Sequence, residues 1–156
     1  LGEIIGSLIE KSFLYLKCNN FKDASITLHG LLEIIAEDIE NHLYSLDFIC
    51  NHDECDEVIE ICEQQIDRNP KDIHAILSKG IIFLLKRDLI EAKHTFSTAI
   101  FLASKNPRCH FCFGVIFYLL EEPKKAIKSV LSACALDFTN NYYNTFYKHL
   151  TKSKFA

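Results

Sequence analysis

Apolar side chains recur every three or four residues along most of this chain, and short polar segments interrupt them at regular intervals. That period predicts amphipathic α-helices. The blocks 80–85 and 114–120 are apolar nearly all round, which predicts helices buried on more than one side. Asp53 and Asp72 are suited to cap the helices that follow them, and Pro107 and Pro123 to begin helices. We predict helices over residues 3–17, 21–35, 39–50, 54–67, 73–86, 89–105, 107–120, 123–136 and 141–151.

The pattern of small residues repeats with a period of 34. Gly80, Ala92 and Ala99 recur as Gly114, Ala126 and Ala133, and the same register extends back through Val58 to Ala24. Four units then tile the chain at 5–38, 39–72, 73–106 and 107–140, and a last helix covers 141–151. The alternative is four unrelated helical hairpins that agree by chance.

Small residues let paired helices approach closely. We therefore expect Gly80 to face Ala92 and Gly114 to face Ala126. The second unit has the larger Leu46 and Val58 in these positions, so we expect irregular packing there.

A period of 34 with small residues at these positions resembles the tetratricopeptide repeat (TPR), a helix-turn-helix unit. The resemblance implies one all-α domain over 1–156, an α-α superhelix of about four repeats with a C-terminal helix. It also implies that the first helix of each unit lines a concave groove. The groove positions that this places in the sequence are Ile9, Phe13, Leu16, Leu43, Leu77, Ile81, Leu84, Arg108, Phe111, Val115 and Tyr118.

These groove positions are mostly apolar, and large apolar side chains left in water form a sticky surface. We expect the groove to be occupied by a helix of the same chain, by a second copy or by another protein. The alternative is that tight curvature lets neighbouring helices of one molecule bury these residues.

Part of the chain has a closer resemblance. The segments Asp67-Arg-x-Pro70, Gly80-Ile-Ile-Phe-Leu, Ile90-x-Ala92 and Phe96-Ser97 resemble the TPR scaffold subunits of the anaphase-promoting complex. The resemblance implies a homodimerising subunit of this ubiquitin ligase, which acts in cell-cycle control. The alternative is a TPR co-chaperone or another adaptor that binds a helix or peptide in its groove. A co-chaperone clamp for a carboxylate needs several cationic positions, and of these only Arg108 has the right character.

The composition of the chain argues against two classes of partner, nucleic acids and membranes. The net charge of −4 argues against nucleic acid, and no apolar run is long enough for a bilayer. The chain begins directly in repeat sequence, so we expect no secretory signal and a nuclear or cytoplasmic location. We expect the seven cysteines to be reduced thiols.

The pairs Cys109/Cys112 and Cys50/Cys55 have the residue type of zinc ligands, but each lacks a second pair nearby, so the signal for a zinc site is weak. We therefore expect a protein partner, the chain itself included. We expect no metal, no cofactor, no small-molecule substrate and no catalysis.

Overall fold

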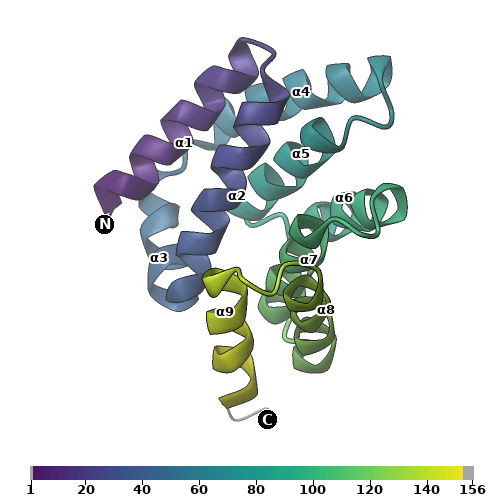
Figure 1. The fold of residues 1–156 in the computed structure, drawn as a ribbon. Helices are drawn as coiled ribbons and strands as arrows, with labels where there is room; N and C mark the ends of the chain where they lie inside the picture. The colour runs from purple at the N-terminus through teal and green to yellow at the C-terminus, as the bar shows by residue number, and fades with distance from the viewer. Residues whose placement is uncertain (1, 153–156) are drawn as a thin grey trace.

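The computed structural model describes residues 2–152, apart from the side chain of Phe48, and these residues form nine helices and no strand. The all-α prediction is confirmed. Most helices follow one another in neighbouring antiparallel pairs, and both ends of the described chain lie at the outer edge of the molecule (Figure 1). The helices are α1 (Gly2–Lys17), α2 (Phe21–Glu37), α3 (Ile39–Ile49), α4 (His52–Arg68), α5 (Ile73–Leu85), α6 (Leu89–Leu102), α7 (Pro107–Leu119), α8 (Pro123–Leu136) and α9 (Asn141–Lys152).

Three helical hairpins, α1–α2, α5–α6 and α7–α8, share one turn geometry. Each turn has a residue in the left-handed region, namely Asn19 (φ 58°), Arg87 (φ 68°) and Glu121 (φ 60°). The amide after each of these residues donates to a carbonyl five residues earlier, as Asp88 N does to Phe83 O at 2.9 Å. This is the Schellman closure of a helix end. Arg87 and Glu121 lie 34 residues apart, and Asn19 lies twice that distance before Arg87. The backbone therefore repeats with the same period as the sequence.

The second unit departs from this geometry. The position equivalent to the three turn residues is Asp53, which lies inside α4. The predicted cap at Asp53 is wrong, because Asn51 caps α4 by accepting from the amide of Glu54 at 3.1 Å. The helix α3 packs on α2, whereas α4 packs on α5 and α1, and α2 packs directly on α5. The expected irregular packing of this unit is confirmed.

The expected pairing of Gly114 with Ala126 is confirmed, because a Cβ on Gly114 would lie 3.5 Å from the Ala126 carbonyl oxygen, but at both glycines a larger side chain comes closer. A Cβ atom on Gly80 would lie 2.4 Å from Cε1 of Phe96, and one on Gly114 would lie 2.4 Å from Cγ2 of Val130. The nearest side chain is therefore one helical turn beyond the predicted Ala92 or Ala126. The space that glycine leaves open is filled by the large neighbour.

Polar contacts tie α3 to the later units. The Arg87 guanidinium donates from Nη2 to the carbonyl of Leu43 at 3.2 Å and pairs with Asp47 at 3.4 Å. The hydroxyl of Tyr118 donates to Glu40. Through these contacts α3 is anchored to the turn after α5 and to the end of α7.

No helix of residues 2–152 combines the length and the apolar character that a membrane crossing requires.

Candidate functional site

The predicted groove positions lie mostly in the core of a single copy. Arg108 and Tyr118 are partly exposed. The buried ones are Ile9, Phe13, Leu16, Leu43, Leu77, Ile81, Leu84, Phe111 and Val115. For these nine residues the structure matches the alternative of burial by neighbouring helices, and it leaves no continuous open groove for them to line.

The helix α9 covers the groove positions of the last unit. The ring of Tyr143 stacks on Phe111 with centroids 4.6 Å apart, and Phe146 meets Phe111 edge-on at 5.7 Å. Phe146 also contacts Tyr118 at 5.9 Å. The aromatic residues of α9 are thus buried against α7, and a helix of the same chain occupies this part of the groove.

A buried polar cluster fixes α9 against α2. Nε2 of His29 lies 2.7 Å from the hydroxyl of Tyr143, and the Asn140 amide donates to Glu33 at 2.9 Å. Burial, and then the positive charge of Arg108, lowers the pKa of His29 to about 3, whereas burial raises the pKa of Glu33. His29 is therefore neutral at pH 7, and its 3.7 Å approach to Glu33 is not an ion pair.

A pocket of about 620 Å³ opens beside this cluster, between α2, the start of α7 and the α8–α9 turn. Inside it the Asn140 amide donates to Glu33 and to Asp137. Arg108 shares the pocket with the carboxylates of Glu33 and Asp137 and with no other Lys or Arg of residues 2–152. Within the described part of the chain, no cationic cluster for a partner's carboxylate therefore forms around Arg108.

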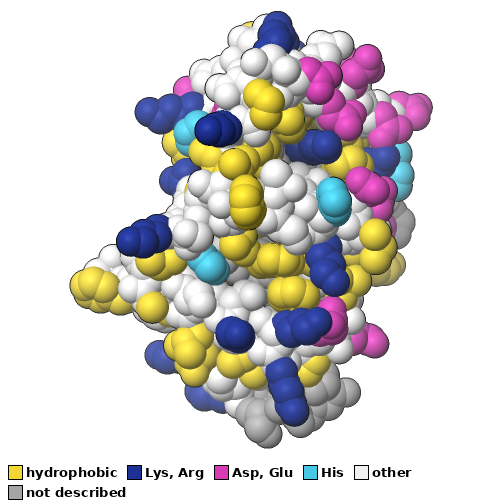
Figure 2. Space-filling model, turned by 90° about the vertical axis from the view of Figure 1, so that its right-hand side faces the viewer, with side chains coloured by type: hydrophobic (Ala, Val, Ile, Leu, Met, Phe, Trp, Pro, Cys, Tyr) yellow, Lys and Arg dark blue, Asp and Glu magenta, His cyan; other side chains and the backbone are white. Residues whose placement is uncertain are grey.

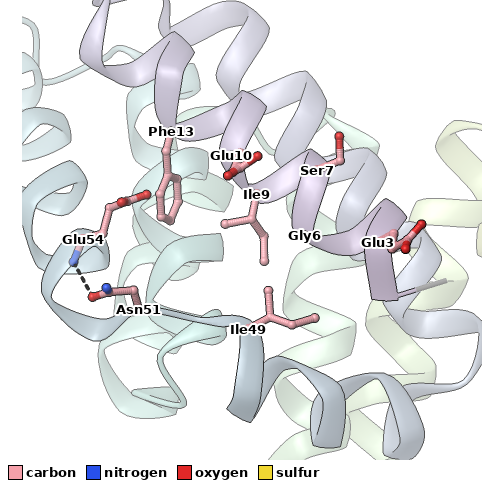
Figure 3. A pocket seen from close by; sticks show the side chains of 9 residues that line it. All are labelled: Glu3, Gly6, Ser7, Ile9, Glu10, Phe13, Ile49, Asn51 and Glu54. Atoms are coloured by element: carbon pink, nitrogen blue, oxygen red, sulfur yellow. Dashed lines mark hydrogen bonds between the residues drawn. The ribbon is translucent and has the colours of Figure 1, made fainter.

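A second hollow, which we call the α1–α4 cleft, has a different character. It encloses about 450 Å³ between α1 and the α3–α4 junction. Figure 3 shows Ile9 pointing across it toward Ile49, with Phe13 beside Glu54. Its lining residues are Glu3, Gly6, Ser7, Ile9, Glu10, Phe13, Ile49, Asn51 and Glu54.

This cleft exists because α3 has left the helix stack. In a regular repeat array the first helix of one unit packs on the first helix of the next, but here α4, not α3, packs on α1. The space toward the end of α3 stays open, and a Cβ on Gly6 would only touch Ile49 at 3.7 Å. The floor is apolar, formed by Ile9, Phe13 and Ile49.

The cleft continues along α1 into an adjoining hollow of about 270 Å³, lined by Glu10, Phe13, Leu14, Lys17 and Glu54. The side chain of Leu14 is 62% exposed at its edge. The apolar surface therefore extends past the floor onto the rim.

The rim of the α1–α4 cleft is acidic. Glu3, Glu10 and Glu54 have no ion pair with any residue in the range 2–152. Elsewhere on α4 such pairs exist, between Glu63 and Lys79 at 3.4 Å and between Asp56 and Lys86. Figure 2 shows further Asp and Glu side chains gathered at the end of the molecule where Figure 1 places α4. The cleft thus offers an apolar floor with carboxylates around it that form no ion pair within residues 2–152, although Lys17 lines the adjoining hollow.

Sequence reasoning found Ile9 and Phe13 but missed the acidic rim. Glu3 and Glu10 are seven residues apart, and this spacing places them on one face of α1, a signal that was available. Nothing in the sequence indicated that Glu54 of α4 would join them, because that depends on the displacement of α3.

The cysteines assemble no metal site in the described part of the chain, where no group of three or more His, Cys, Asp or Glu has ligand geometry. Cys109 and Cys112 are fully buried in α7. Cys62 is buried in the core, as its position in the repeat predicts.

Comparison with known proteins identifies the fold. No family model and no curated protein matches the sequence. Among solved structures, the first TPR domain of human RPAP3 is 12% identical, with a TM-score of 0.61 over 77% of this chain and 90% of that one. A TPR protein of Thermus thermophilus is 15% identical, with a TM-score of 0.58 over 94% and 80% of the two chains. PcrH in complex with the chaperone binding region of PopD is 19% identical, with a TM-score of 0.54 over 74% and 87%.

At such identities a structural likeness establishes the fold and nothing finer. The described helices, their repeated turns and these neighbours agree: this chain has the all-α superhelical fold of tetratricopeptide-repeat domains.

Proposed function

We propose that this chain is a non-enzymatic adaptor that binds a segment of a partner protein in the α1–α4 cleft, and that the segment carries apolar residues flanked by Lys or Arg. The observation that carries the proposal is an apolar floor ringed by three carboxylates that have no ion pair in the described part of the chain. Support for an interaction role comes from structural neighbours with bound segments, the first TPR domain of Spaghetti with an HSP90 peptide and PcrH with PopD.

The floor and the rim have different physical tasks. Each apolar side chain that is buried against Ile9, Phe13 and Ile49 contributes roughly 1.5–3 kcal/mol, more than an exposed ion pair does. The carboxylates of Glu3, Glu10 and Glu54 select the sign of the flanking charges and speed encounter, and salt weakens both effects. A partner with acidic flanks is repelled.

A second copy of the chain is the other occupant that we consider. This follows the resemblance to homodimerising subunits of the anaphase-promoting complex. Its support is the apolar side chains exposed on α1, Leu14 and Ile4, the latter 52% exposed. The proposal that this chain is a subunit of such a ligase rests on that resemblance alone.

The test uses two synthetic 15-residue helical peptides with the same leucine positions, one with Lys and one with Glu at every charged position. Fluorescence anisotropy should show micromolar binding of the basic peptide that weakens with added salt, and no binding of the acidic peptide. The double variant Glu10→Gln/Glu54→Gln should weaken binding roughly twofold to thirtyfold, because each exposed ion pair contributes about 0.2–1 kcal/mol.

The matched control is Glu60→Gln/Asp67→Asn, which removes the same charge from exposed positions of α4 outside the cleft. It should bind the basic peptide as the wild type does. An equal loss of affinity in both double variants would show that only the net charge matters, and it would contradict binding in the cleft. Light scattering on the same samples reports whether a second copy is the occupant: a stable dimer that the basic peptide does not dissociate would place the interface elsewhere.

A further inference from the structure

Two cysteines lie in contact at the junction of α3 and α4. Cys50 follows the last residue of α3, and Cys55 lies in the first turn of α4. Their Sγ atoms are 3.7 Å apart. A disulfide holds two sulfurs at about 2.05 Å, so the two sulfurs must move closer before they can bond, and only four residues separate the two cysteines along the chain.

The two thiols differ in exposure and in acidity. Cys50 is partly exposed, whereas Cys55 is fully buried. The contact between the two sulfurs lowers the pKa of Cys50, although burial and the carboxylates of Asp47 and Glu54 act against it. The same contact, together with burial, raises the pKa of Cys55. A partly exposed thiol with a lowered pKa beside a buried thiol is the arrangement of an attacking and a resolving cysteine.

We propose that Cys50 and Cys55 form a reversible thiol–disulfide pair, a redox modification site that takes small-molecule disulfides such as glutathione disulfide as its oxidant. The Cys50 thiolate attacks one sulfur of the oxidant and forms a mixed disulfide, and the first thiolate leaves and takes up a proton. The Cys55 thiol gives its proton to solvent, and its sulfur attacks the Cys50 sulfur and expels the second thiolate. Two protein thiols are oxidised, and one external disulfide is reduced to two thiols.

Charged groups near the pair also shift the pKa of each thiol. The nearest carboxylates that oppose the Cys50 thiolate are Asp47 and Glu54. On the other side of the pair, Lys86 lies close enough to lower the pKa of Cys55, and its own ion pair with Asp56 holds it there. Lys86 thus favours the transient thiolate of the resolving cysteine.

The bond would lie in one wall of the α1–α4 cleft. Ile49 and Asn51 flank Cys50 and Glu54 precedes Cys55, and all three line the cleft. A disulfide between Cys50 and Cys55 would therefore restrain this wall of the cleft, and its effect on a partner rests on the proposed function. The redox site does not rest on the proposed function, and the experiment below detects only the covalent state of the cysteines.

The intact chain is equilibrated with mixtures of reduced and oxidised glutathione, quenched with acid, alkylated and digested without reductant. Cleavage after Glu54 separates Cys50 from Cys55, and cleavage after Glu57 or Glu60 removes Cys62. The expected result is two peptides joined by one disulfide, with a loss of two hydrogens, in the wild type and in the control Cys18→Ser, which removes an exposed thiol.

Cys50→Ser and Cys55→Ser should both lose this linked pair. Cys55→Ser should accumulate a glutathione adduct at residue 50, because no thiol resolves it, and Cys50→Ser should form none at residue 55. Persistent glutathione on Cys50 of the wild type, or adducts confined to Cys18, would overturn the proposal.

Discussion

At the scale of single residues, two glycines allow the paired helices to pack closely. Gly80 and Gly114 occupy the same repeat position, and each accommodates a large side chain from the next helix, Phe96 or Val130. The sequence predicted the need for a small residue there but not the larger side chain that comes closest. Periodicity gives the face of a helix, but the size of the opposing side chain decides which turn makes the contact.

The glycines make a paired test. Gly80→Ala should lower the free energy of unfolding by roughly 1–3 kcal/mol, because its Cβ overlaps the ring of Phe96. Gly30→Ala, in α2, should raise it by roughly 0.5–1 kcal/mol, because its Cβ meets nothing within 4 Å and alanine favours the helix. Urea denaturation followed by circular dichroism measures both. Equal effects of the two substitutions would contradict the packing described here.

His29 makes stability depend on pH. Its pKa falls from 6.5 to about 3 on folding, so between these values the unfolded state binds a proton that the folded state does not. Stability should therefore fall as pH falls below 6.5, by at most about 1.4 kcal/mol per pH unit. Glu33, whose pKa is raised, acts with the opposite sign above its ordinary value of 4.5. Thermal unfolding from pH 7 to 5 should be less pH-dependent in His29→Gln and unchanged in the exposed control His94→Gln. An identical slope in His29→Gln and the wild type would mean that His29 titrates normally.

At the scale of elements, several helix starts were predictable and helix placement was not. Asp72 caps α5 by accepting from the amides of His74 and Ala75, and Pro107 and Pro123 begin α7 and α8, as predicted. These features depend on neighbouring residues alone. The displacement of α3 depends on long-range contacts of Arg87 and Tyr118, which no local pattern encodes. The acidic rim of the cleft was missed for the same reason.

Two of the residues with positive φ, Arg87 and Glu121, allow backbone strain to be tested apart from the contacts that hold α3. Glu121→Gly should raise the free energy of unfolding by about 1 kcal/mol, because glycine adopts positive φ without strain. Arg87→Gly relieves the same strain but removes the bonds to Leu43 and Asp47. Amide hydrogen exchange in residues 39–49 should therefore become faster in Arg87→Gly and stay unchanged in Glu121→Gly. Unchanged exchange in both variants would show that Arg87 does not hold α3.

At the scale of the whole molecule, the sequence predicted the superhelix but not the extent to which one copy buries its own groove positions. Nine of the eleven apolar or polar positions identified from the repeat register lie in the core, and α9 of the same chain covers Phe111. Leu84→Asp, a surface change if the groove were open, would place a carboxylate at a fully buried position and should unfold the chain. The surface that we propose for a partner is the α1–α4 cleft, where α3 leaves space beside α1.

The most direct test of that account is methyl nuclear magnetic resonance of the isoleucines during titration with the basic peptide. Ile9 and Ile49 face each other across the cleft, and Ile26 lies in the separate pocket between α2, α7 and the α8–α9 turn. The account predicts shifts of the Ile9 and Ile49 methyl signals that saturate together, with Ile26 unmoved. Saturable shifts at Ile26 with none at Ile9 and Ile49 would contradict it.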